Sequence, residues 1–339
     1  DLEGEVRTNV ISRPFDKLLV ANRGEIARRI MRTARRLGIH TIAVYSEADE
    51  EALFALEADE KHLIGPPPPK ESYLRFDRIL EVARATGARA IHPGYGFLSE
   101  NATFARAVRG LNMAFVGPSP EAMEKLGGKL SARRIAEAAG LPVVPGSGAL
   151  GDLAEAKRVA AELGYPVMLK AAAGGGGIGM VVAEDEKRLE RGFEDAQKKG
   201  ATFFGDGTVY LEKLIQKPAH VELQILADSR RRVVVLGERD CTVQRRNQKV
   251  IEEAPSPRLG EAQREAMQSA ALRLAEVAGY ENAGTVEMIV GGAGDSAGRF
   301  YFLEVNSRLQ VEKGSRSRAD PVPRLSLKRS TTTCSSAPA

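Results

Sequence analysis

A lysine followed closely by a run of glycines constrains this chain more than any other stretch. Residues 165–180 read YPVMLKAAAGGGGIGM, with Lys170 at the end of a short apolar run. Glycine has no Cβ, so the backbone can bend sharply and its N–H groups can approach an anion. A flexible surface hairpin explains the glycines alone equally well. The lysine and the apolar run favour a nucleotide phosphate loop, although the spacing is not the GxxxxGK[ST] of a Walker A loop.

The bulk composition is ordinary for a globular protein. The 339 residues suit roughly two to three domains, with 43% hydrophobic and 28% charged residues. Residues 314–339 hold five basic residues and one acid, which supply the whole net charge of +4, so this charge is no evidence for nucleic-acid binding. Two cysteines without a CxxC or Cys/His cluster argue against zinc and disulfides. No run suits a membrane span, and we expect a cytoplasmic protein, or a mitochondrial matrix protein if the source is eukaryotic.

The first part of the chain, residues 14–122 after an extension at 1–13, predicts an open α/β domain. A strand at 17–21, a helix that begins at Glu25 and a strand at 41–45 form a βαβ unit, which implies a parallel sheet. The polar, glycine-rich stretch 92–100 is expected as a loop at the carboxyl edge of that sheet, where such folds bind ligands. An ordered connecting turn is equally compatible with its composition.

Residues 123–313 predict an α+β domain. We expect one amphipathic helix at 123–140 that carries Lys129, and a mobile lid at about 142–215 that contains the glycine loop. The remaining elements are expected to be strands at 221–227, 232–236, 285–290 and 299–305 and a helix at 261–278. Residues 314–339 lack periodicity and are expected to be disordered.

Two acids on neighbouring strands suggest a metal site. Glu287 and Glu304 lie in otherwise apolar strands, and Asn306 follows Glu304 on the same face. Carboxylate and amide oxygens are the ligands that Mg²⁺ prefers, although solvated strand acids are the alternative.

Several charged side chains could bind an anion or move a proton. The stretch 238–249 has mixed charges and lacks interleaved aromatics, which favours an anion site or a salt-bridged loop over RNA binding. Arg308 could bind a small anion, and Glu312 nearby could remove a proton. His220 is a candidate polar contact, although a single histidine is more often structural.

Seven motifs, in this order, resemble the biotin carboxylase family within the ATP-grasp fold. They are KLLVANRGEIARRI, AIHPGYGFLSEN, YPVMLKAAAGGGGIGM, EKLIQKPAHVELQILAD, ERDCTVQRRNQKVIEEAPSP, AGTVEMIV and FLEVNSRLQVE, and they span about residues 14 to 312. The chain looks most like the biotin carboxylase part of the alpha chain of an acyl-CoA carboxylase. The GGGGIGM and QRRNQK variants also resemble urea carboxylases, and a pyruvate carboxylase component is a further alternative.

The resemblance implies a chemistry and a set of partners. In the family, ATP with Mg²⁺ (or Mn²⁺) phosphorylates bicarbonate to carboxyphosphate, which yields CO₂ that carboxylates N1 of biotin. This is the first half-reaction of a biotin-dependent carboxylase. The implied partners are a biotin carboxyl carrier domain, on another chain or a domain not contained here, and a carboxyltransferase. A homodimer is also implied, and neither nucleic acid nor membrane is.

The resemblance also implies roles for individual residues. The implied nucleotide-binding residues are Lys129, Lys170, Gly176, Gly177, Glu212, Lys213, Leu214, Ile215, His220, Gln244 and Asn247. The implied metal ligands are Glu287, Glu304 and Asn306. Lys249, Arg308, Gln310 and Val311 would surround bicarbonate, with Glu312 as the base that deprotonates it. Arg308 would stabilise the developing negative charge.

The sequence departs from the family pattern at a few positions. Ile178 and Ala219 stand where basic residues are common, and Asn247 stands where many members have histidine. After RLQVE the family continues with His-Pro-Val-Thr-Glu and a longer section, whereas Lys313 and a low-complexity tail follow here. We therefore expect an ATP-grasp domain that is incomplete at its C-terminus through truncation, frameshift or splicing. An inactive nucleotide-binding remnant is the alternative to an active enzyme.

Overall fold

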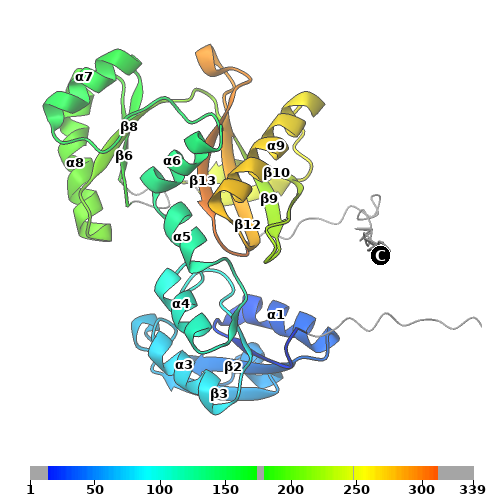
Figure 1. The fold of residues 1–339 in the computed structure, drawn as a ribbon. Coiled ribbons are helices and arrows are strands. Elements are labelled where there is room, and N and C mark those ends of the chain that lie inside the picture. Colours follow the sequence, from blue (N-terminus) through cyan, green and yellow to red (C-terminus); the bar gives the residue numbers. More distant parts are fainter. Residues whose placement is uncertain (1–13, 174–178, 247, 312–339) are drawn as a thin grey trace, which may run out of the picture.

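The structure is a computed structural model that describes residues 14–173, 179–246 and 248–311. Three sheets organise these residues (Figure 1). One is a five-stranded sheet in the order β3-β2-β1-β4-β5, one a five-stranded sheet in the order β11-β10-β9-β12-β13, and one a three-stranded sheet in the order β7-β6-β8. The extension predicted at 1–13 and the tail predicted at 314–339 lie outside the described residues.

The first sheet is parallel throughout, as the βαβ pattern predicted. Its strands are β1 (Lys17–Val20), β2 (His40–Ser46), β3 (Glu60–Gly65), β4 (Ala90–His92) and β5 (Ala114–Phe115). Its helices are α1 (Gly24–Arg36), α2 (Leu53–Glu57), α3 (Phe76–Ala85) and α4 (Ala102–Gly110), with 3₁₀ turns η1 (Glu47–Asp49) and η2 (Pro69–Glu71). Gly38, with φ +66°, follows the end of α1, where a left-handed residue favours glycine. Stretch 92–100 leaves β4 at the carboxyl edge of this sheet, which confirms the predicted position.

The single helix predicted at 123–140 is wrong, because two helices occupy this stretch. They are α5 (Pro120–Gly127) and α6 (Lys129–Ala138), and Gly128 between them is extended, with φ −93° and ψ 133°. Two adjacent glycines are poor helix formers, so the chain breaks there at low cost. The break places Lys129 at the first position of α6 rather than in a helix interior.

The three-stranded sheet carries the lysine of the glycine loop. Its strands are β6 (Val167–Ala171), β7 (Met180–Ala183) and β8 (Val209–Lys213), and α7 (Leu153–Leu163) and α8 (Glu186–Phe204) pack against it. Strands β6 and β7 are antiparallel, with Lys170 opposite Met180, which confirms the predicted hairpin. This unit has its own apolar core.

The antiparallel sheet separates an apolar face from a polar face. Its elements are β9 (Ala219–Ala227), β10 (Val233–Arg245), β11 (Gln248–Glu253), β12 (Asn282–Val290), β13 (Phe300–Asn306), α9 (Glu261–Ala278) and the 3₁₀ turn η3 (Gly294–Ser296). Side chains such as Val221, Leu223 and Met288 pack with α6 and α9, which lie across one face of the sheet (Figure 1). Since side chains alternate along a strand, Glu222 and Glu287 point to the other face.

The stretch 238–249, for which the sequence favoured an anion site or a salt-bridged loop, is largely strand. Strand β10 continues to Arg245, with a register shift between Val235 and Glu238 at Gly237, whose φ is +110°. Glu238, Arg239 and Asp240 in this strand are buried and paired with neighbouring side chains, and such a run of charged residues did not indicate a strand. None of the described helices is long and apolar enough to cross a membrane.

Candidate active site

A cavity of about 340 Å³ lies between the lysine hairpin and the polar face of the antiparallel sheet. Lys129 reaches it from α6, Lys170 from β6, and Glu287 and Glu304 from the sheet. Among the other predicted residues, His220 and Gln244 also line it. A smaller adjoining cavity shares Met168, Lys170, Pro218, Ile289 and Leu303 with it and is also lined by Glu212, Lys213, Leu214 and Ile215. Most of the predicted nucleotide-binding residues thus meet in one place.

The two lysines bring positive charge into this cavity. The Nζ of Lys170 donates to the carboxylate of Glu212, and both side chains are nearly buried. Arg133 holds the other oxygen of Glu212, with Nη1 3.2 Å from Oε1. Burial lowers the pKa of Lys129, against the attraction of the Glu304 charge. The Nζ of Lys213, in contrast, donates to the carbonyl oxygens of Gly164 at 2.7 Å and Tyr165 at 3.2 Å.

The two predicted metal ligands face each other, because Glu287 and Glu304 are direct partners across β12 and β13. Oε1 of Glu287 accepts from Asn306 Nδ2 at 2.7 Å and from Lys249 Nζ at 3.0 Å, and its Oε2 lies 2.9 Å from His220 Nε2. Burial raises the pKa of Glu287, but the His220 contact and the Lys249 charge outweigh it and hold that pKa below its usual range.

The pKa of Glu304 is shifted in the opposite direction. Burial and the neighbouring Glu287 charge both raise the pKa of Glu304. A divalent cation between the two carboxylates would offset this repulsion. The amide oxygen of Asn306 is the third candidate ligand, although in this structure it accepts from Arg308 Nη2, and Nδ2 is the atom that faces Glu287. The donors are all oxygens, so the set fits Mg²⁺.

A fully buried acid, Glu222, which is not among the predicted site residues, joins this site to strand β10. Its carboxylate accepts from Arg239 Nε and from Lys249 Nζ. We call Glu222, Arg239, Lys249, Glu287 and His220 the buried charge network. In the sequence, Glu222 could have been found as an acid between Val221 and Leu223, whose side chains lie in the apolar core.

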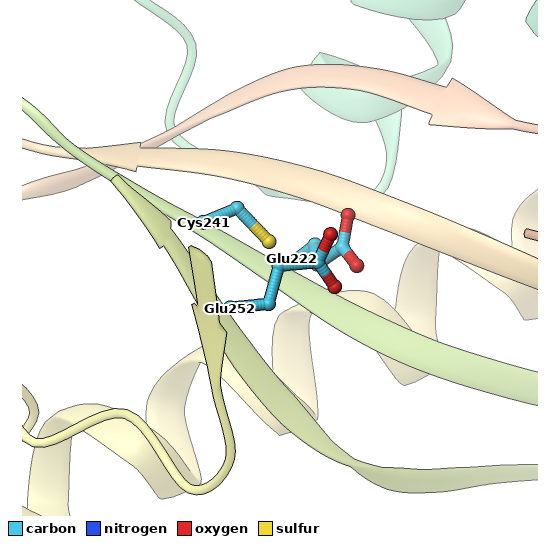
Figure 2. A group of neighbouring side chains, drawn as sticks. All are labelled: Glu222, Cys241 and Glu252. Atoms are coloured by element: carbon cyan, nitrogen blue, oxygen red, sulfur yellow. The ribbon is translucent and has the colours of Figure 1, made fainter. Parts of the chain in front are cut away.

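Figure 2 shows Cys241 directed toward the carboxylates of Glu222 and Glu252, and one ligand atom of each lies within 4.8 Å of the others. Burial and the Glu222 charge raise the pKa of the Cys241 thiol, which keeps it protonated. Arg239 and Lys249 already balance the charge of Glu222. We therefore assign no metal ion to this group.

The predicted bicarbonate residues lie on the segment after β13 and beside the buried charge network. Arg308 donates from Nε to Glu100 Oε2 at 3.0 Å and from Nη2 to Asn306 Oδ1 at 2.8 Å. Gln310 is 3% exposed, and its Oε1 lies 3.5 Å from Lys249 Nζ. Val311 is 52% exposed at the end of the described chain. Gly176, Gly177, Asn247 and Glu312 lie outside the described residues.

Comparison with known proteins identifies the fold and the family. Residues 14–123 match the family model of the biotin carboxylase N-terminal domain, and residues 128–325 match that of the carbamoyl-phosphate synthase L chain ATP binding domain. A crystal structure of a biotin carboxylase complex with β,γ-ATP from Campylobacter jejuni superposes with a TM-score of 0.85. It is 48% identical in sequence and covers 88% of this chain and 66% of its own.

Sequence relatives point to the same family. A biotin carboxylase of Halalkalibacterium halodurans is 54% identical over 88% of this chain, which spans 65% of that relative. A propionyl-CoA carboxylase alpha chain of Ruegeria pomeroyi is 50% identical over 88% of this chain and 43% of its own length. One component of the pyruvate carboxylase of Methanothermobacter thermautotrophicus is 52% identical over 88% of this chain and 60% of its own. These matches confirm the resemblance that the motifs indicated, and the chain belongs to the biotin carboxylase family.

Proposed function

We propose that this chain carboxylates biotin with bicarbonate in an ATP- and Mg²⁺-dependent reaction that passes through carboxyphosphate. One observation carries the proposal. A single cavity combines Lys129 and Lys170 with the facing carboxylates Glu287 and Glu304, and Arg308 is linked to that pair through Asn306. Phosphoryl transfer depends mainly on positioning and on neutralising the charge of the phosphates, and these groups supply both.

The nucleotide would lie across the two adjoining cavities. Leu214, Ile215 and Leu303 offer an apolar surface for the base in the smaller cavity. The lysines of the larger cavity are then placed for the phosphates. In this arrangement, Lys170 exchanges its contact with Glu212 for a phosphate oxygen, and Arg133 keeps Glu212 paired.

Glu287, Glu304 and Asn306 would hold Mg²⁺ beside the phosphates. When bound, Mg²⁺ supplies positive charge to the phosphate oxygens. His220 and Lys249 contact Glu287 in the present arrangement and orient its carboxylate.

Bicarbonate would be bound next to this pair by Lys249, Arg308, Gln310 and the Val311 backbone. Arg308 would stabilise the negative charge that develops as bicarbonate attacks the terminal phosphate. By resemblance to the family, Glu312 would remove the proton from bicarbonate, and Gly176, Gly177, Gln244 and Asn247 would bind the nucleotide.

The biotin would be presented by a carrier domain, and a carboxyltransferase would use the product, with the chain acting as a homodimer. We favour an acyl-CoA as the final acceptor, which the propionyl-CoA carboxylase relative supports. Pyruvate is the alternative, which the pyruvate carboxylase relative supports. We further propose domains at 14–122 and 123–313, with a lid at 142–215, because the separate sheets have separate apolar cores.

The test is ATP hydrolysis by the purified chain with bicarbonate, Mg²⁺ and free biotin. We expect hydrolysis that requires bicarbonate and rises with biotin. Glu304→Gln should abolish it without loss of fold. ATP binding without turnover would indicate a nucleotide-binding protein, and turnover that biotin does not stimulate would indicate a different ATP-grasp ligase.

A further inference from the structure

An acid from the loop that follows strand β4 reaches the segment that carries Arg308. Glu100 lies on the loop between β4 and α4, and its Oε1 accepts from the backbone N–H of Ser307 at 3.0 Å and from the Ser307 hydroxyl at 3.3 Å. Its Oε2 accepts from Nε of Arg308 at 3.0 Å. One carboxylate therefore fixes both the path of the backbone at Ser307 and the rotation of the Arg308 side chain.

A second hydrogen bond holds the Nη2 side of the Arg308 guanidinium. Nη2 of Arg308 donates to Asn306 Oδ1 at 2.8 Å, and Asn306 Nδ2 donates to Glu287 Oε1 at 2.7 Å. An arginine has five N–H donors in a planar fork, so these two contacts set its plane and leave donors for an anion. Arg308 is 23% exposed by side chain, which leaves it accessible to a small ligand.

The loop before Glu100 is built to hold one conformation. The Asn22 side chain donates to the carbonyl oxygens of Pro93 at 2.7 Å and Tyr95 at 2.8 Å. Phe97 has φ +42°, an unfavourable value for a residue with a side chain, and its ring stacks on Tyr73 at 5.1 Å. Such strained positions persist only where the surroundings determine them, and they gather near functional sites.

From this geometry we propose that Glu100 is a positioning residue for Arg308, and that it orients the guanidinium toward the bicarbonate anion. The inference rests on the proposed anion-binding role of Arg308. It gives the polar stretch 92–100 a function that its position at the carboxyl edge of the sheet did not by itself explain. The loop between β4 and α4 then contributes to the reaction by holding one side chain of the segment after β13.

A matched control exists elsewhere between the same two parts of the chain. Arg109 on α4 pairs with Glu281, just before β12, at 2.9 Å and with similar exposure. The hydrogen bond of this pair joins Arg109 Nη2 to Glu281 Oε2, and neither residue is among the proposed site residues. Glu281→Gln therefore removes an ion pair of the same kind and keeps the hydrogen bond between Glu100 and Arg308.

The first measurement needs no turnover. In the ¹⁵N-labelled full chain, the arginine Nε–H signal that disappears in Arg308→Lys belongs to Arg308. We expect Glu100→Gln to move this signal and Glu281→Gln to leave it unchanged. In the presence of Mg²⁺ and a non-hydrolysable ATP analogue, we expect bicarbonate to shift this signal in both chains. The unaltered chain should need about a tenfold lower bicarbonate concentration than Glu100→Gln, because a charge-assisted hydrogen bond typically changes affinity by that factor or more.

The second measurement is kinetic. Glu100→Gln should raise the KM for bicarbonate about tenfold and change the KM for ATP by less than about twofold, because it disturbs one ligand only. In the Arg308→Lys background, Glu100→Gln should add less than about twofold, because its target is gone.

Equal effects on ATP and bicarbonate, or additive effects with Arg308→Lys, would overturn the inference, as would an Arg308 signal that Glu100→Gln does not move. If the unaltered chain hydrolyses no ATP, the proposed function fails, and the signal titration alone decides. A bicarbonate shift that Glu100→Gln weakens supports the inference. A shift that is equal in both chains, or absent from both, overturns it.

Discussion

Replacing Glu222 by glutamine removes one negative charge from the middle of the antiparallel sheet while it keeps the size of the side chain. Glu222 is 0% exposed and accepts hydrogen bonds from Arg239 and Lys249. After the change, Lys249 keeps Glu287 at 3.0 Å, but Arg239 keeps only the neutral Gln224, at 3.2 Å, among the described residues. The variant therefore leaves one buried cation without a charged partner from this network.

The size of the effect follows from burial. Breaking a buried ion pair typically costs about 3–5 kcal/mol, and we expect about 3 kcal/mol because Lys249 keeps one acid. The charges of Glu287 and Glu222 raise the pKa of Lys249 above its usual value although burial alone would lower it, so attraction exceeds desolvation here. For a folding unit of this size, about 3 kcal/mol lowers the melting temperature by roughly 6–12 °C.

Thermal unfolding of the nucleotide-free chain, followed by circular dichroism, measures this shift. The control is Glu162→Gln, which removes an ion pair with Arg158 whose two side chains are 63% and 64% exposed. An exposed pair contributes at most about 1 kcal/mol, so the control should melt within about 4 °C of the unaltered chain. Adding Lys249→Met to Glu222→Gln should destabilise less than the sum of the two changes. A Glu222→Gln shift no larger than the control's, or strict additivity, would refute the reasoning.

Three further predictions follow from single contacts. Gly146→Ala places a Cβ 2.4 Å from the Leu211 carbonyl oxygen and should cost about 1–3 kcal/mol in chemical denaturation, whereas Gly148→Ala has open space and should be neutral. The Arg23 hydrogen bonds hold the pKa of Asp49 below its usual value, so its stabilisation is present above about pH 4 and is lost as the pH falls further. Asp49→Asn should therefore flatten the acid limb of a plot of melting temperature against pH. Lys170→Met should weaken Mg·ATP binding at least about tenfold by calorimetry.

Each of these three predictions would be contradicted by one specific result. Equal stability of the Gly146→Ala and Gly148→Ala chains would show that the backbone at Leu211 yields to the added carbon. An unchanged acid limb in Asp49→Asn would mean that Asp49 does not lose its charge-dependent stabilisation in that range. Unaltered ATP affinity in Lys170→Met, with an unchanged melting temperature, would remove Lys170 from the proposed phosphate site.

Much of the fold could be predicted from local patterns. The helix predicted at 261–278 is α9 residue for residue, and the lysine hairpin pairs as expected. The acids at 287 and 304 could be matched because each interrupts an apolar strand, and the strands pair in the register that places them opposite one another. Periodicity reports which face of an element is buried, and that information is local.

The secondary-structure predictions that were wrong depended on information that a local pattern does not carry. The helix break at Gly128 depends on two adjacent glycines inside a longer amphipathic pattern, and helix propensity is weak evidence for a break at such a position. The charged part of strand β10 was expected to be an anion site or a salt-bridged loop, because its charged residues do not fit a buried strand until Glu222 is placed beside Arg239. A polar residue in a strand is read correctly only when its partner is known.

By itself, the sequence determined many of the helices and strands, the family, and the residue types available for nucleotide, metal and anion. Only the tertiary structure decided which charges meet: Arg239 and Lys249 at Glu222, Arg133 and Lys170 at Glu212, and Glu100 at Arg308. Such pairs join distant parts of the chain, up to 208 residues apart for Glu100 and Arg308. Hydrogen bonds act over about 3 Å, so no local pattern can specify a contact that exists only after the sheets have packed.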